Sequence, residues 1–130
     1  MESQVKSLIA QYFRYLQLKD VDRLLGFFDY QAEIHEPFST HGIATGRASI
    51  ESFLRFMTSI NADLKYQVST IHPPISRDVG PTANAMLWVK SDRAIPYEHI
   101  FLLNPMPRIE PNGDNGIRRL DIRQEQFLER

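Results

Sequence analysis

The first third of the chain repeats apolar residues at helical spacing. Apolar side chains recur every three or four positions within residues 5–18, with polar residues between them, which predicts an amphipathic helix. Lys19 and Asp20 interrupt this repeat. Asp20 is a residue type that caps helix starts, so we expect a second, short helix with apolar positions from Val21 to Phe28. The two helices would form a hairpin.

A strand and a third helix are predicted next. Residues 32–36 suit a strand that Pro37 ends, because proline cannot donate a hydrogen bond to a sheet. Residues 39–45 are expected to form a loop, and Gly46 precedes a helix whose apolar residues share one side. Those residues are Ile50, Phe53, Leu54 and Met57.

The second half of the chain alternates apolar and polar residues at period two, which is typical of strands. Strands are predicted at residues 66–71, 83–89, 97–103 and 117–122. The proline- and glycine-containing segment 104–116 is expected to form a long, mobile hairpin tip. Three helices followed by antiparallel strands predict a single α+β domain, residues 1–130, whose sheet curls around the helices.

Composition narrows the class of protein. The chain has 130 residues, 42% of them hydrophobic, and a net charge of -1, which suits a globular core and disfavours a broad nucleic-acid surface. It contains no cysteine, so disulfides, thiolate metal sites and a cysteine nucleophile are excluded. Because neither a long apolar run nor a secretory signal is recognised, we expect a cytoplasmic protein without membrane partners.

Tyr12, Glu36 and His99 are polar residues at positions where the pattern favours apolar ones. Glu36 lies two positions from both Ile34 and Phe38, so strand alternation would place it on the buried face. Loss of water there would make its carboxylate a stronger base, as general-base catalysis near neutral pH requires. Tyr12 and His99 offer hydrogen-bond donors for a ligand oxygen while Glu36 moves a proton.

Each of these residues also has a purely structural interpretation. Tyr12 could be an aromatic residue at the edge of the core whose hydroxyl reaches water. A register shift of one residue would expose Glu36 and turn His35 inward instead. His99 shares its strand face with Tyr97, and a buried neutral histidine is often only a core residue.

The order of these elements resembles the nuclear-transport-factor-2-like (NTF2-like) superfamily, and within it the SnoaL-like and ketosteroid-isomerase-like branch. The likeness covers nearly the whole chain. It is carried by Tyr12 in the first helix, the Lys19–Leu25 segment, Glu36-Pro37-Phe38, and Gly46 before the third helix. The resemblance implies a conical α+β fold with three N-terminal helices packed in a curved antiparallel sheet.

The resemblance also implies roles for the three polar residues. Ketosteroid isomerases carry a tyrosine donor at the position of Tyr12, a catalytic aspartate followed by Pro-Phe at that of Glu36, and an acid donor at that of His99. Because this chain has His99 where the isomerases have an acid donor, the resemblance implies that a different ligand oxygen is bound at this position. Neutral imidazole donates from one nitrogen and accepts at the other, so His99 could hold a carbonyl or an enolate, or shuttle protons.

A narrower similarity links the chain to the C-terminal domain of orange carotenoid proteins. It is carried by Glu36-Pro37-Phe38 and by residues 101–105. Those domains bind the keto oxygen of a carotenoid without chemistry, using a tyrosine at the position of Tyr12 and a tryptophan at that of His99. Only the tyrosine is matched here.

An apolar pocket wall is expected around the three polar residues. Matching against the family places Met86 and Trp88 toward the cavity and Ala85 and Leu87 on the other face. Ordinary core packing is the alternative for the whole wall. The residues expected to contact a substrate are Leu16, Phe38, Phe53, Met57, Met86, Trp88, Tyr97 and Phe101.

The sequence thus predicts a cofactor-independent isomerase, cyclase or dehydratase acting on a small apolar carbonyl compound, with Glu36 as general base and Tyr12 and His99 stabilising the oxyanion. No metal is expected, because the histidines lack ligand spacing. A non-catalytic binding module, for a ligand such as a carotenoid, and a dimeric scaffold domain stay open. A homodimer through the sheet is expected, with Arg119, Asp121 and Arg123 on one face of the last strand.

Overall fold

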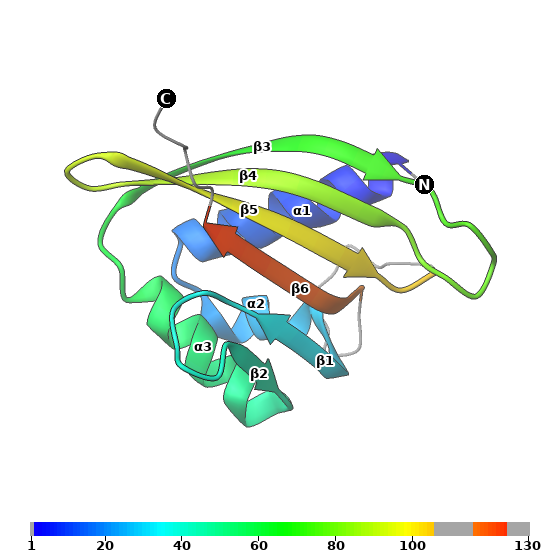
Figure 1. The fold of residues 1–130 in the computed structure, drawn as a ribbon, viewed down its shortest axis with the longest axis horizontal. Helices are drawn as coiled ribbons and strands as arrows, with labels where there is room; N and C mark the ends of the chain where they lie inside the picture. Colours follow the sequence, from blue (N-terminus) through cyan, green and yellow to red (C-terminus); the bar gives the residue numbers. More distant parts are fainter. Residues whose placement is uncertain (1, 106–115, 125–130) are drawn as a thin grey trace.

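A computed structural model describes residues 2–105 and 116–124, which form three helices on one face of a six-stranded sheet (Figure 1). The predicted α+β class is confirmed, with a curved sheet that does not close. The helices are α1 (Glu2–Gln17), α2 (Val21–Gly26) and α3 (Arg47–Thr58). The strands are β1 (Phe28–His35), β2 (Ile43–Thr45), β3 (Asp63–His72), β4 (Thr82–Lys90), β5 (Ala94–Leu103) and β6 (Ile117–Gln124).

The order of the strands across the sheet is β2-β1-β6-β5-β4-β3. Neighbouring strands are antiparallel at every pair except β1 and β6, which run parallel. The prediction of an antiparallel sheet is therefore wrong at this one pair. Parallel pairing is possible there because most of the chain lies between β1 and β6, which is ample length for a crossover connection.

The element bounds differ from the predictions at two further places. The segment 39–45, expected as a loop, contains β2, whose three residues are too few to produce a recognisable alternation. The second helix ends at Gly26, because Phe28 begins β1 and is buried in the core. Most of the hairpin tip predicted at 104–116 lies outside the described residues.

Side-chain hydrogen bonds cap α2 and attach α3 to the start of β1. Asp20 caps α2 as predicted, since its Oδ1 accepts a hydrogen bond of 3.2 Å from the backbone N–H of Arg23. Arg47, at the start of α3, donates from Nη2 to the carbonyl of Phe28 at 3.0 Å. Its guanidinium also lies 4.3 Å from the centre of the Tyr30 ring. These contacts tie α3 to the start of β1.

The core lies between the helices and the face of the sheet that they cover, which we call the inner face. His99 on β5 pairs with Ala85 on β4, and both are buried there with Leu87. Met86 and Trp88 occupy the alternate positions of β4, so their side chains point to the opposite, outer face, where they are half-buried. The prediction that they line the cavity is therefore wrong. Apolar residues occur in both alternating sets of side chains along β4, so the sequence pattern alone did not show which face of the strand is buried.

Candidate functional site

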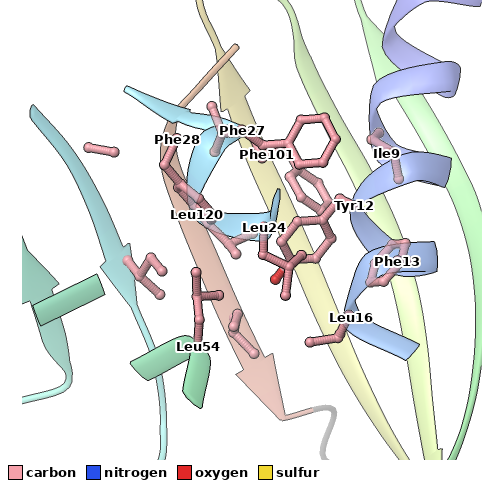
Figure 2. Packing of buried hydrophobic residues seen from close by; sticks show 14 of the residues in the cluster. Ile9, Tyr12, Phe13, Leu16, Leu24, Phe27, Phe28, Leu54, Phe101 and Leu120 are labelled. Atoms are coloured by element: carbon pink, nitrogen blue, oxygen red, sulfur yellow. The ribbon is translucent and has the colours of Figure 1, made fainter. Parts of the chain in front are cut away.

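Tyr12 lies at the centre of the core, on the side of α1 that faces the sheet (Figure 2). Its side chain is fully buried, with ring centres 5.1 Å from Phe13, 6.2 Å from Phe28, 6.4 Å from His99 and 5.4 Å from Phe101. The hydroxyl has no hydrogen-bond partner among the described residues. Burial raises the pKa of Tyr12 well above its usual value, so the hydroxyl keeps its proton.

His99 brings a second fully buried polar group to the same cluster of rings. Its Nδ1 lies 3.4 Å from the carbonyl oxygen of Tyr97, and its Nε2 has no partner among the described residues. Burial lowers the pKa of His99 to about 4, and the contact with Tyr97 offsets only part of this effect. The ring is therefore neutral at pH 7. Its predicted placement on the same strand face as Tyr97 and Phe101 is confirmed.

Glu36 follows the last residue of β1 and is half-buried, so it is less shielded from water than strand alternation predicts. The strand ends before Pro37, and the Glu36 carboxylate then holds the loop that follows. Its Oε1 accepts hydrogen bonds from the backbone N–H of Phe38 at 3.0 Å, the N–H of Ser39 at 2.9 Å and the Ser39 hydroxyl at 3.2 Å. Its Oε2 accepts none from the described residues.

The register predicted for β1 is confirmed by the burial of its side chains. Ile34 is buried on the inner face, whereas His35 lies 3.6 Å from Glu33 on the other face. The alternative register, with His35 turned inward, is thus excluded. Glu36 comes two residues after Ile34, and it lines a pocket together with Ala44, which pairs with Ile34. Glu36 therefore lies on the inner side of the sheet, just beyond the end of β1.

Strand pairing sets the separation between Glu36 and His99. His35, the last residue of β1, pairs with Asp121 on β6, and continuing this register by one residue would set Glu36 opposite Ile122. Ile122 pairs with His99 on β5. With neighbouring strands ~4.8 Å apart, the backbones of Glu36 and His99 are roughly 10 Å apart. The two side chains share the inner side of the sheet, with the buried Ile122 between them.

Glu36 lines a surface pocket of about 520 Å³ between its loop and α3. Phe38 packs against Phe53 at 6.3 Å and Phe56 at 5.6 Å between ring centres, and against Tyr97 at 5.4 Å. Phe38 therefore contacts both α3, beside the pocket, and β5. The other residues lining the pocket are Ser39, Ile43, Ala44, Ala48, Ser49 and Ser52.

The structure brings only some of the predicted site residues together. Tyr12 and His99 meet in the core, but neither lines the pocket that contains Glu36. Phe38 and Phe53 line the pocket of Glu36, while other members of the predicted wall fill the core. The latter are Leu16, Met57 and Phe101.

Phe56 is a pocket residue that the sequence analysis missed. It lies outside the apolar stripe of α3 and is 47% exposed. A large aromatic residue on the polar side of an amphipathic helix was the signal that could have identified it.

Two other predicted features concern charged groups and membranes. No cluster of three His, Asp or Glu side chains that could hold a metal ion occurs in residues 2–105 and 116–124. None of the helices described is long and apolar enough to cross a membrane. Arg119 and Asp121 share the outer face of β6, as predicted, and form an ion pair of 2.8 Å.

The unpaired hydroxyl of Tyr12 predicts the effect of removing it. We expect Tyr12→Phe to raise the free energy of unfolding by about 1 kcal/mol, because the variant no longer desolvates a polar group without a partner. Urea unfolding of both proteins measures this difference. Tyr66→Phe, at an exposed ring, serves as the control and should change stability less. A marked loss of stability in Tyr12→Phe would show that the hydroxyl is bonded in solution.

The buried His99 predicts a pH dependence of stability. Its pKa is about 4 in the folded protein and 6.5 when unfolded, so the unfolded chain binds the proton first as the pH falls. His99 therefore changes nothing above about pH 7 and destabilises the fold progressively between pH 6.5 and 4, by roughly 3 kcal/mol at the lower end. Urea unfolding at pH 7.5 and 4.5 measures this. His99→Leu should lose that part of the dependence, and equal slopes for both proteins would contradict it.

The sequence matches no model of a known protein family, and no curated protein matches it. Solved structures do match. A ketosteroid isomerase-like protein from Erwinia carotovora atroseptica aligns with a TM-score of 0.70 and 13% identity, over 96% of this chain and 96% of that one. Nuclear transport factor 2 from Cryptosporidium parvum aligns with a TM-score of 0.65 and 15% identity, over 95% and 94%.

A third similar structure is the epoxide hydrolase/cyclase-like enzyme SalBIII, described in pyran ring formation of the polyether salinomycin. It aligns with a TM-score of 0.65 and 18% identity, over 95% of this chain and 92% of that one. Identities this low establish the shared fold and no activity. The resemblance identified from the sequence is confirmed at that level: this chain has the NTF2-like fold, in common with nuclear transport factor 2 and ketosteroid isomerase-like proteins.

Proposed function

We propose that the protein binds a small apolar molecule with an oxygen function inside its conical interior and rearranges it without a cofactor, as an isomerase, cyclase or dehydratase. The observation that carries this proposal is the pair of fully buried, unpartnered polar atoms, Tyr12 Oη and His99 Nε2. Native proteins pair nearly all such atoms. Leaving one unpaired costs about 1–3 kcal/mol, which a bound ligand oxygen would recover.

Glu36 is the general base in this proposal. It lies on the same side of the sheet as His99, and its Oε2 accepts no hydrogen bond from the described residues. A molecule that spans the distance between them would place its oxygen at Tyr12 and His99 and an acidic C–H near the carboxylate. Glu36 would take that proton and return it to another carbon, so that no proton is gained or lost overall.

Entry of the ligand requires Phe38 to move. Phe38 contacts Phe53 at the pocket and Tyr97 on β5, the strand that also carries His99, and these contacts support a path past its ring from the open pocket to the buried pair. The ring is 36% exposed and belongs to a loop outside the sheet, which leaves it freer to move than a core residue. Displacing Phe38 would join the pocket of Glu36 to the interior.

A non-catalytic binding module is the second candidate function, and one observation favours it. The Oε1 atom of Glu36 is fully used in holding the loop at Phe38 and Ser39, which is a structural task. In that case the interior would bind the same class of ligand, and Glu36 would keep the loop closed without moving a proton.

Glu36→Gln separates these two functions. The glutamine keeps an acceptor oxygen for the amides of Phe38 and Ser39 but cannot act as a base, so thermal stability and ligand affinity should stay unchanged. A catalytic base predicts a fall in rate on the order of 10²–10⁴-fold. The measurement is deuterium uptake, followed by NMR, at the carbon next to the carbonyl of 6-hydroxy-2-tetralone, which carries both a hydroxyl group and an acidic C–H.

Glu36→Ala is the matched variant, because it removes the base and the hydrogen bonds of the loop together. It should lose exchange activity and also melt at a lower temperature. Equal exchange rates for wild type and Glu36→Gln would exclude Glu36 as the base and leave the binding module.

We also propose that two copies pair through the outer face of the sheet. None of the three described helices covers this face of β4 and β5, which carries half-buried Met86, Trp88 and Ile100. Glu98 is the register partner of Arg123 on the neighbouring strand there. An apolar centre with charges of both signs suits contact with an identical surface.

Sedimentation equilibrium tests this pairing. We expect twice the 15.1 kDa mass of the chain at about 100 µM, a concentration that a typical homodimer of micromolar affinity exceeds. Trp88→Lys should shift the mass toward the monomer, since it places a charge in the apolar centre of the contact. Ile75→Lys, at a fully exposed loop position, is the control and should leave the mass unchanged. A wild-type protein with the mass of one chain would contradict the proposal.

A further inference from the structure

The carbonyl of Tyr97 determines which nitrogen of His99 carries the proton. Nδ1 lies 3.4 Å from that carbonyl oxygen, and a carbonyl oxygen can only accept a hydrogen bond. A hydrogen bond across this contact forms only when Nδ1 carries the proton, so the contact favours that tautomer. Because the buried ring is neutral, it has only this one proton, and Nε2 keeps its lone pair. His99 thus presents an acceptor to the interior, where the resemblance to ketosteroid isomerases implies a donor.

The surroundings of Nε2 provide no donor for this lone pair. The His99 ring packs 5.4 Å from Phe13 and 6.0 Å from Phe101, and neither side chain has a polar hydrogen. Tyr12 lies 6.4 Å away between ring centres, and its hydroxyl is itself unpartnered. Two neighbouring rings therefore offer one unused acceptor and one hydroxyl that can donate.

We infer that the ligand of this interior carries a hydroxyl group, as an alcohol, phenol or enol, which accepts a hydrogen bond from Tyr12 and donates one to Nε2 of His99. This inference rests on the proposed function, because it specifies the ligand of the same interior. A hydroxyl is the smallest group that both accepts and donates. It satisfies both buried atoms at once.

A ketone without a hydroxyl is the molecule that His99 selects against. Its oxygen can accept from Tyr12, but it has no hydrogen for Nε2, which stays desolvated and unpaired. A site built around a polar partner rejects analogues that leave that partner unpaired much more strongly than an apolar pocket rejects a change of one methylene. His99 is therefore the residue that determines specificity, and Tyr12 is common to both classes of ligand.

The tautomer of His99 is measured first, on the full ¹⁵N-labelled chain without ligand. Long-range ¹H–¹⁵N NMR at pH 7 distinguishes the two neutral forms of each of the four histidines, and His99→Leu identifies the signal of His99. We expect the proton on Nδ1. A proton on Nε2 would overturn the inference and leave the proposed function standing, so this experiment separates the two.

Binding of a matched pair of probes is measured next by calorimetry. 2-Naphthol carries a hydroxyl, and 2-tetralone is its ketone counterpart with an acceptor only. We expect 2-naphthol to bind at least about tenfold more tightly. The ratio should fall toward one in His99→Leu, and it should persist in the control Phe101→Leu, which changes packing next to His99 without removing the acceptor.

The remaining outcomes are also decisive. Equal affinities in the wild type would overturn the inference, and would mean that a water molecule satisfies Nε2 whichever probe is present. A preference that survives in His99→Leu would assign the hydroxyl to another partner and overturn it as well. Failure of both probes to bind would overturn the inference and the proposed function together.

Discussion

Packing of α1 against the inner face of the sheet is the interaction on which the rest of this structure depends. Tyr12 is at its centre and contacts four other rings, contributed by α1, β1 and β5. Burial of apolar area supplies the main stabilisation, and each well-oriented aromatic pair adds about 0.5–1.5 kcal/mol. The same packing removes water from the hydroxyl of Tyr12 and the imidazole of His99. A stable core and an unsatisfied polar pair therefore have one cause.

The chemistry of the buried pair is decided by a backbone atom. The carbonyl of Tyr97 lies 3.4 Å from Nδ1 of His99, and in our proposal it directs the proton to Nδ1 and leaves Nε2 as an acceptor. An acid donor at this position would stabilise an oxyanion, whereas a neutral histidine in this tautomer would not. In our proposal, His99 and its backbone neighbour thus determine which ligand fits the interior of this NTF2-like fold.

Glu36 links the loop to the chemistry proposed for the site. The carboxylate that is placed to move a proton also accepts the hydrogen bonds that hold Phe38 in position. Phe38 in turn lines the open pocket and contacts Tyr97 on β5. Protonation of the carboxylate would weaken its role as an acceptor, so proton transfer and movement of the aromatic ring are expected to be coupled.

The sequence by itself determined the helices, the cap at Asp20 and the register of β1, because these follow from local periodicity and from the preferences of single residues. It did not determine which face of β4 meets the helices, since Met86 and Leu87 are both apolar and only the docking of α1 distinguishes them. The candidate residues Tyr12 and His99 were identified because polar groups stood in apolar patterns. Their burial and their lack of partners were decided by tertiary structure alone, because desolvation and hydrogen bonding in the core depend on which segments, distant in sequence, are brought into contact.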